Sequence, residues 1–223
     1  MRLVADNLCV ARSGQIFFSG ISFSLSSGEA LVVSGPNGVG KSTFLRVLAG
    51  LLPDAEGSVR LAGADFESVA EGAHYLGHRN GMKRELTVRE NLEFWRDFMA
   101  SGGGGQKNGR ASVLDAIRAV GLDGIDYLPF GYLSAGQQRR IAMARLLVSH
   151  RPLWILDEPT SALDVHAQQM FAGLVANHLG KGGLTVVATH HALGLRNVRS
   201  LVLQPDAEAS LDAGDPFAAE ASA

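Results

Sequence analysis

The 223-residue sequence predicts an α/β fold with a mainly parallel sheet and an inserted helical subdomain. Three observations favour this class. Several short apolar runs end in glycines or carboxylates, which is typical of buried parallel strands. The first of these runs passes through a glycine-rich turn into a helical apolar period. A long stretch in the middle of the chain has only helical patterns, which indicates an insertion between strands.

The predicted elements follow one another from the N-terminus. Residues 30–34 form a buried strand, residues 35–40 a glycine-rich turn, and residues 41–49 a helix that Gly50 ends. Further helices are predicted at residues 87–99, 110–120 and 138–148. Further strands are predicted at residues 58–62, 73–77, 153–157, 184–189 and 200–204, and the later ones are continuously apolar.

The composition, with 46% hydrophobic and 19% charged residues, predicts one large domain with a substantial core. A formal charge of −2 provides no field for nucleic acid, so we expect no nucleic-acid partner. The single cysteine, Cys9, cannot close an internal disulfide, which favours a reducing compartment. Since neither a secretion signal nor a long apolar run is visible, any membrane role is expected to come through a partner.

The domain is expected to span residues 1–204, with the helical subdomain over about residues 79–150. Residues 205–223 hold five acidic residues and neither Lys nor Arg. This acidic segment is rich in alanine and poor in large apolar residues, so we predict that it is disordered.

Residues 35–43 match the phosphate-loop pattern, between a predicted strand and a predicted helix. The backbone N–H groups of such a loop turn toward phosphate oxygens, and the helix N-terminus adds its positive end. Lys41 is expected to reach the β- and γ-phosphates, and Ser42 to offer its hydroxyl to Mg²⁺. The predicted nucleotide-binding residues are Gly35, Pro36, Asn37, Gly38, Val39, Gly40, Lys41, Ser42 and Thr43.

Two carboxylates, Asp157 and Glu158, end the predicted strand at residues 153–157. A magnesium contact and a base for water belong at such a strand end. We expect Asp157 to hold the metal shell and Glu158 to orient or deprotonate water. Two acids at a strand end can also be a solvated turn, and their pairing with the phosphate loop favours the catalytic interpretation.

Residues 133–137 closely resemble the signature sequence of ATP-binding cassette (ABC) proteins. Residues 161–164 look like the family's D-loop, which ends at Asp164, and His190 looks like its catalytic switch histidine, so the resemblance covers most of the chain. It implies a P-loop NTPase core with an antiparallel β subdomain, and ATP and Mg²⁺ as cofactors. It also implies a head-to-tail dimer, in which the signature of one copy closes over the ATP of the other. The signature residues that would act in trans are Leu133, Ser134, Ala135, Gly136 and Gln137.

Two positions depart from the family pattern. The family usually has a metal-sensing glutamine where this chain has His78, which either takes a catalytic place or is an ordinary histidine at a strand end. The family also tends to carry an aromatic residue on which adenine stacks, about two dozen residues before the phosphate loop. Arg12 occupies that place, and its planar guanidinium can stack on a base. Phe17 or Phe18 is the substitute, unless both belong to the core.

Residues 78–95, 131–137 and 151–154 are similar to the ATP-binding subunit of the cytochrome c maturation system, also described as the haem exporter ATPase. The histidine at position 78 agrees with this group. The resemblance implies an ATPase at the cytoplasmic face of a bacterial inner membrane, with separate membrane-spanning subunits of that system as partners. It would drive haem export or the release of a haem-loaded chaperone. Because the chain has no Cys-x-x-Cys-His string, we expect it not to bind haem directly.

Other functions stay open, because the nucleotide motifs do not define the cargo. The chain is alternatively the ATPase subunit of a transporter for another substrate. A soluble ABC ATPase that acts on DNA or the ribosome is disfavoured, since only one phosphate loop is present. The basic residues Arg79, Lys83 and Arg84 form a hypothetical docking surface for a cytoplasmic helix of the membrane partner, or else a solvated loop.

Overall fold

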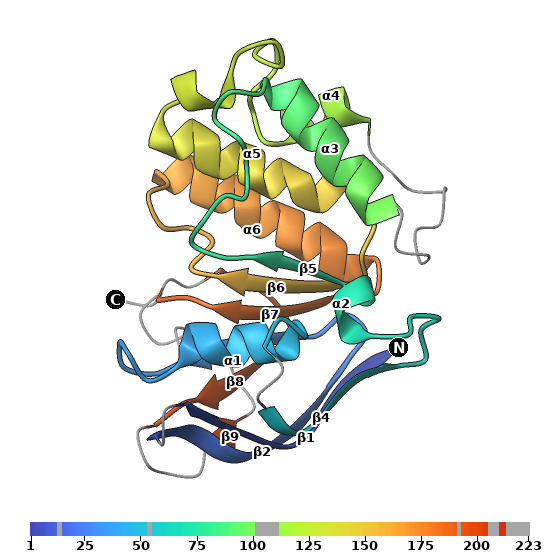
Figure 1. Cartoon of the computed structure of the whole chain (residues 1–223), viewed down its shortest axis with the longest axis vertical. Coiled ribbons are helices and arrows are strands. Elements are labelled where there is room, and N and C mark those ends of the chain that lie inside the picture. The colour runs from blue at the N-terminus through green and yellow to red at the C-terminus, as the bar shows by residue number, and fades with distance from the viewer. Residues whose placement is uncertain (13–14, 53–54, 101–111, 191–192, 205–209, 213–223) are drawn as a thin grey trace.

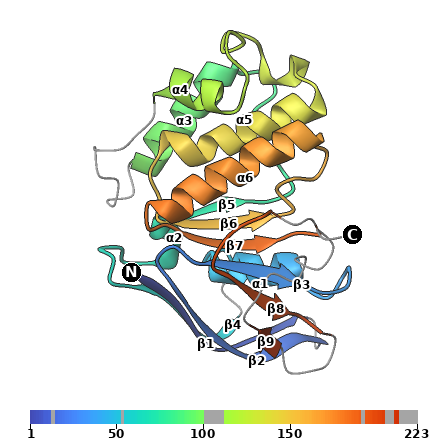
Figure 2. The ribbon, with the colours of Figure 1, turned by 180° about the vertical axis from the view of Figure 1, so that it is seen from behind.

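The computed structural model describes residues 1–12, 15–52, 55–100, 112–190, 193–204 and 210–212. These residues form two sheets and a layer of helices (Figure 1). Helix α1 lies between the two sheets, and helix α6 covers the other face of the larger sheet, with the remaining long helices beyond it (Figure 2). The expected α/β class with an inserted helical part is therefore confirmed.

The larger sheet has the strand order β5-β6-β7-β3-β8-β9, and all its neighbouring strands are parallel except the pair β8 and β9. Because helices cover both faces, its central strands are apolar on both sides, as the sequence predicted. The bounds are β3 (Ala30–Ser34), β5 (Ala73–Leu76), β6 (Leu153–Asp157), β7 (Leu184–Ala188), β8 (Val198–Val202) and β9 (Ser210–Asp212).

The smaller sheet is antiparallel, with the order β2-β1-β4, and contains β1 (Arg2–Arg12), β2 (Gln15–Ser26) and β4 (Ala55–Ala62). The resemblance implied such a sheet, but the apolar pattern predicted only part of β4. In β1 the register shifts after Ala5, beside Asn7 with its φ of 49°. This irregularity moves the buried positions from odd to even numbers, which breaks the alternation that marks a strand.

All four predicted helices are present in the structure: the one that follows the phosphate loop, and the three predicted at residues 87–99, 110–120 and 138–148. Helix α6 was not predicted, although its buried Ala167, Phe171, Val175 and Leu179 recur every four residues. Part of the predicted helix at 110–120 lies outside the described residues. The bounds are α1 (Lys41–Leu48), α2 (Val69–Gly72), α3 (Val88–Ala100), α4 (Val113–Ala119), α5 (Ala135–Val148) and α6 (Val165–Gly180).

The core has two parts, one on each face of the larger sheet. On β3, Leu31 and Val33 pack with α1 and the antiparallel sheet, whereas Val32 packs with α5 and α6. Alternate side chains of β3 thus pack on opposite faces of the sheet, so the phosphate loop follows a strand that is held from both sides. Among the described residues, no helix is long and apolar enough to cross a membrane.

One expectation for the acidic segment is wrong in part. Residues Ser210–Asp212, within the segment predicted to be disordered, form β9 and pair antiparallel with β8. The open edge of β8 offers unpaired backbone groups, which can hold a passing segment whatever its composition. The other residues of 205–223 lie outside the described residues.

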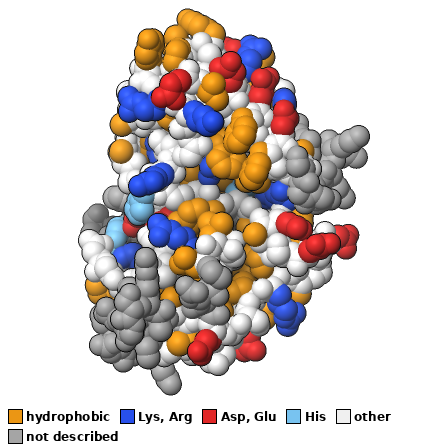
Figure 3. Space-filling view, in the orientation of Figure 1, with side chains coloured by type: hydrophobic (Ala, Val, Ile, Leu, Met, Phe, Trp, Pro, Cys, Tyr) orange, Lys and Arg blue, Asp and Glu red, His pale blue; other side chains and the backbone are white. Residues whose placement is uncertain are grey.

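A groove of about 880 Å³ lies between α3 of the helical layer and the α1 and β5 side of the core. Hydrophobic side chains gather there, with Lys and Arg side chains beside them (Figure 3). Trp95 and Phe98 of α3 line one wall, and Tyr75, His78 and Arg79 line another.

Candidate active site

The phosphate loop and the carboxylates that end β6 line one cavity of about 310 Å³. His78, just after β5, lines it as well. The structure therefore brings together three segments that are far apart in the sequence. The residues that line the cavity are Asn37, Gly38, Gly40, Lys41, Ser42, Thr43, His78, Asp157 and Glu158.

The loop itself depends on glycine. Gly35 has a φ of 136°, and a Cβ at this position would lie 2.4 Å from the carbonyl oxygen of Leu203. Gly40 forms the N-cap of α1 with a φ of 104°. The ammonium group of Lys41 donates to the carbonyl oxygens of Gly35 at 2.7 Å and Pro36 at 3.0 Å. The lysine thus folds back across the loop and places its charge at the cavity.

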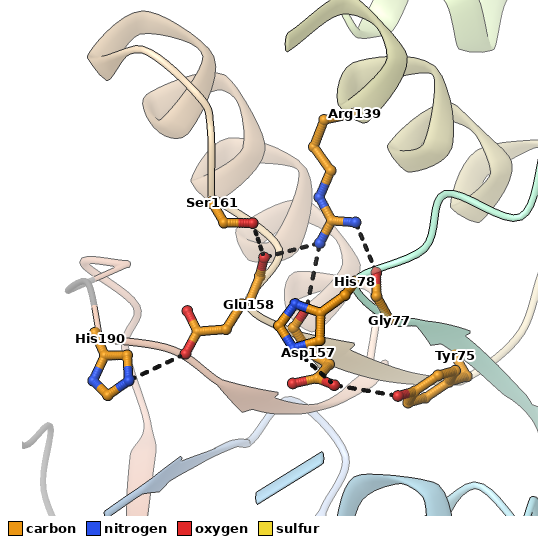
Figure 4. Close-up of polar contacts among 8 residues, drawn as sticks. All are labelled: Tyr75, Gly77, His78, Arg139, Asp157, Glu158, Ser161 and His190. Atoms are coloured by element: carbon orange, nitrogen blue, oxygen red, sulfur yellow. Dashed lines mark hydrogen bonds and ion pairs between the residues drawn. The ribbon is translucent and has the colours of Figure 1, made fainter. Parts of the chain in front are cut away.

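Asp157 ends β6 and is 1% exposed. Its Oδ2 accepts a hydrogen bond from the Tyr75 hydroxyl at 3.3 Å and lies 3.7 Å from Nε2 of His78 (Figure 4). Burial raises the pKa of Tyr75 above its usual value, and the negative charge of Asp157 adds to this shift. Tyr75 therefore stays protonated and acts as the donor.

Glu158 has a φ of 45°, in the left-handed region that residues other than glycine rarely adopt. Its N–H donates to the carbonyl of Ala188 at 2.8 Å, and its own carbonyl accepts from Ser161 Oγ at 3.0 Å. Oε1 of its carboxylate lies 3.4 Å from Nε2 of His190, which is half exposed. The backbone turn directs this carboxylate toward His190 (Figure 4), and Glu158 lines the cavity.

Arg139 of α5 also contacts the backbone of Asp157 and Glu158, and the sequence did not predict this role. The guanidinium is buried and donates to main-chain carbonyls at the ends of β5 and β6 (Figure 4). Burial lowers its pKa, and the nearby charges of Asp157 and Glu158 oppose that shift. No sequence signal separates it from the other arginines of α5, because its contacts are tertiary.

The signature residues lie elsewhere in the fold. None of residues 133–137 lines the cavity of the same chain. Ser134 is exposed and caps α5, where its Oγ accepts from Gln137 N at 3.3 Å and the Gln137 side chain accepts from Ser134 N at 2.9 Å. Asp164 similarly caps α6, since its carboxylate accepts from Ala167 N at 2.7 Å.

The candidates for adenine stacking have different outcomes. Phe18 is 5% exposed and packs edge-on against Phe44, with the ring centroids 5.3 Å apart, so it belongs to the core. Arg12 belongs to β1, but its side chain and that of Phe17 lie outside the described residues.

The donor chemistry of the cavity fits Mg²⁺. The Ser42 hydroxyl and the Asp157 carboxylate are hard oxygen donors that line the same space. In the described part of the chain, no three His, Cys, Asp or Glu side chains gather into a metal-binding cluster. A few protein oxygens beside a phosphate site suit Mg²⁺, which keeps several water ligands and binds substrate phosphates.

Known proteins resemble this chain in sequence and in fold. A model of the ABC transporter family matches residues 18–161. The cytochrome c biogenesis ATP-binding export protein CcmA of Rhizobium meliloti is 58% identical, over 90% of this chain and 97% of that protein. The protein of the same name from Mesorhizobium japonicum is 56% identical, over 87% and 94% of the two chains.

Two solved structures share the fold. One is a putative ABC transporter ATP-binding protein from Pyrococcus furiosus, with a TM-score of 0.75 and 21% identity over 91% of this chain and 98% of that chain. The other is described as an ATP-binding subunit of an ABC transporter, with a TM-score of 0.81 and 19% identity over 99% of this chain and 93% of that chain. At these identities the likeness extends to the fold alone.

Proposed function

The chain belongs to the ABC transporter family, among its ATP-binding subunits for cytochrome c biogenesis, and we propose that Glu158 is the general base with which it hydrolyses ATP. The ATPase would drive haem export, or the release of a haem-loaded chaperone, in cytochrome c maturation. One observation carries the catalytic part of the proposal. The phosphate loop and the Glu158 carboxylate line the same cavity.

Binding of ATP is assigned to the loop and Lys41. The N-terminus of α1 and the loop N–H groups would hold the phosphate oxygens. Lys41 would exchange the carbonyls of Gly35 and Pro36 for the β- and γ-phosphates. This exchange needs only a rotation of a side chain whose charge already lies at the cavity.

Hydrolysis is assigned to the groups at the end of β6. The Glu158 carboxylate takes a proton from a water molecule while the water oxygen bonds to the γ-phosphorus, and the bond to the bridging oxygen breaks to release ADP. His190, 3.4 Å from Oε1, would hold this carboxylate in place. When bound, Mg²⁺ neutralises charge on the phosphate oxygens. Ser42 and Asp157 would hold it, and His78 would orient Asp157 from 3.7 Å.

A second copy of the chain would complete the site. Ser134 is exposed and does not line the cavity of its own chain. The positive end of the helix dipole at the N-terminus of α5 suits an anion on another molecule. A head-to-tail dimer would bring the signature of each copy to the ATP of the other.

The groove between the helical layer and the core would receive a cytoplasmic helix of a membrane-spanning partner. Its apolar wall of Trp95 and Phe98 suits the apolar face of a helix, and Arg79 suits an acidic residue on it. Lys83 and Arg84 are exposed but do not line the groove. Of the three basic residues, Arg79 is therefore the one that would contact a helix docked in the groove. The chain would act at the cytoplasmic face of the inner membrane through this contact.

Two experiments test the proposal. Cells that lack the gene should lose c-type cytochromes, and the wild-type chain should restore them whereas Glu158→Gln should not. Normal cytochrome levels with Glu158→Gln would contradict a role for hydrolysis. In detergent extracts, Arg79→Glu should lose the copurifying membrane subunits, and Lys83→Glu should retain them. Equal retention by both variants would contradict docking in the groove.

A further inference from the structure

The side chain of Arg139 on α5 links the helical layer to the catalytic end of β6 by hydrogen bonds. It lies one turn into α5 and is 4% exposed. Its Nε donates to Pro159 O at 2.9 Å, and its Nη2 donates to Glu158 O at 2.9 Å and Asp157 O at 3.3 Å. Three consecutive carbonyls therefore converge on a single guanidinium group.

These carbonyls belong to a backbone segment that needs support. Glu158 has a φ of 45°, and a non-glycine residue keeps this conformation only where its surroundings hold it. The planar fork of arginine offers five N–H donors in fixed directions, which a lysine ammonium cannot reproduce. Arg139 thus favours the turn that directs the Glu158 side chain into the cavity.

The same guanidinium also holds the segment on the other side of Asp157. Its Nη1 donates to Gly77 O at 2.7 Å and to Asn80 Oδ1 at 3.4 Å. Gly77 precedes His78, so the segment that carries His78 and the segment that carries Glu158 share one anchor on α5. That helix begins at the signature residues, only a few positions before Arg139.

We propose that Arg139 is a positioning residue that sets the backbone of Glu158 and so couples the signature helix to the general base of the same chain. The proposal rests on the proposed role of Glu158. When Ser134 engages the ATP of the neighbouring copy, a small shift of α5 is carried through Arg139 to the carbonyls of the catalytic segment. Each copy then becomes competent for hydrolysis as its signature closes on the other.

The test uses the full-length chain and two matched substitutions on α5. Arg139→Lys keeps the charge but cannot hold three carbonyls, and we expect kcat to fall about tenfold or more while the Kd for ATP stays within about twofold. Arg140→Lys is the control, because Arg140 also donates to two carbonyls, those of Val120 and Gly121, which lie away from the catalytic segment. We expect its kcat to stay within about twofold of the wild type.

A double-mutant cycle separates positioning from a general loss of structure. If Arg139 acts through Glu158, then Arg139→Lys should lower the single-turnover rate of the Glu158→Gln chain by less than about twofold. Equal losses in both backgrounds, or an undiminished kcat for Arg139→Lys alone, would overturn the proposal. If thermal unfolding shows that Arg139→Lys does not fold, Arg139→Gln serves in the same cycle with the same expected outcomes.

The two levels of the proposal fail in different ways. A wild-type rate for Glu158→Gln contradicts the assignment of Glu158 as the base. A slow Glu158→Gln chain beside an unaffected Arg139→Lys chain contradicts the role of Arg139 alone.

Discussion

The hydroxyl of Tyr75 lies 3.3 Å from Oδ2 of Asp157, so a side chain that lines the groove also holds the carboxylate at the nucleotide cavity. The groove and the nucleotide cavity therefore share a wall. His78 belongs to this wall as well, because it lines both.

Tyr75→Phe is expected to weaken the use of Mg²⁺. The change keeps the ring and removes the hydrogen bond to Asp157, and partners of a metal-holding carboxylate commonly affect metal affinity about tenfold. The Mg²⁺ concentration for half-maximal ATPase activity should therefore rise several-fold to about tenfold, with kcat at saturating Mg²⁺ little changed. Tyr127→Phe, at an exposed tyrosine, is the control. An unchanged Mg²⁺ requirement would exclude this role for the hydroxyl.

Glu158→Gln should retain ATP binding and lose turnover. The amide still accepts a hydrogen bond but cannot take a proton, so the rate of phosphate release should fall by about 10² to 10⁴. ATP should then trap the dimer in its closed form, which size-exclusion chromatography detects. Glu85→Gln, at an exposed glutamate of the loop after β5, should behave as the wild type. Phosphate release by Glu158→Gln near the wild-type rate would refute the base assignment.

Mixed dimers test the action of the signature in trans. Lys41→Ala removes a positive partner of the phosphates and should raise the Kd for ATP, whereas Ser134→Arg should block closure over the nucleotide of the other copy. Each variant alone should be nearly inactive. A mixture contains one site with an intact loop and an intact signature, so ATP-dependent crosslinking between the two variants should reappear. If mixing restores no crosslinking, or Ser134→Arg alone hydrolyses ATP normally, the trans assignment fails.

The stability of the chain should fall in mild acid because of two buried histidines. Burial lowers the pKa of His74 to about 3 and that of His178 to about 4, below the ordinary value of 6.5. Since the unfolded chain binds these protons first, the contribution is complete above about pH 6.5 and is lost as the pH falls toward 4 and then 3. The free energy of unfolding at pH 5 should therefore be lower than its value well above pH 6.5 by about 2 kcal/mol for each histidine.

Urea unfolding of two variants, one at a buried histidine and one at an exposed histidine, tests this pH dependence. His178 stacks on Trp154 with a centroid distance of 4.0 Å, so His178→Phe preserves the stacking and removes the titrating group. Its unfolding free energy should depend less steeply on pH between 7 and 5 than that of the wild type. His166→Gln, on the exposed face of the same helix, should retain the full dependence. Identical slopes for all three chains would contradict the prediction.

The central sheet could be predicted closely because helices cover it on both faces. Strands β3 and β6 have the same bounds in the structure as in the sequence analysis, since a strand buried on both sides is an uninterrupted apolar run. Strand β1 could not be predicted in this way, because the irregularity beside Asn7 shifts its alternation by one residue.

The residues of the site also differ in whether a local sequence pattern predicts them. Lys41 and Glu158 could be predicted because each belongs to a local pattern of strand, turn and helix. The contacts of Tyr75 and Arg139 could not, since they join positions more than 15 residues apart and depend on how α5 and β5 pack against β6. Local patterns therefore predict which groups line the cavity, and tertiary packing defines which groups hold them in place.

The mutual hydrogen bonds of Ser134 and Gln137 mean that the signature turn is preorganised in the single chain. In the proposed dimer, association of two copies would lose little conformational entropy at this surface, because no backbone would have to be ordered there. The free energy released on contact with a phosphate would then be available for bringing the two copies together. Such an interface would assemble without local folding, so it could form and dissolve in every round of turnover, and the nucleotide would govern its lifetime.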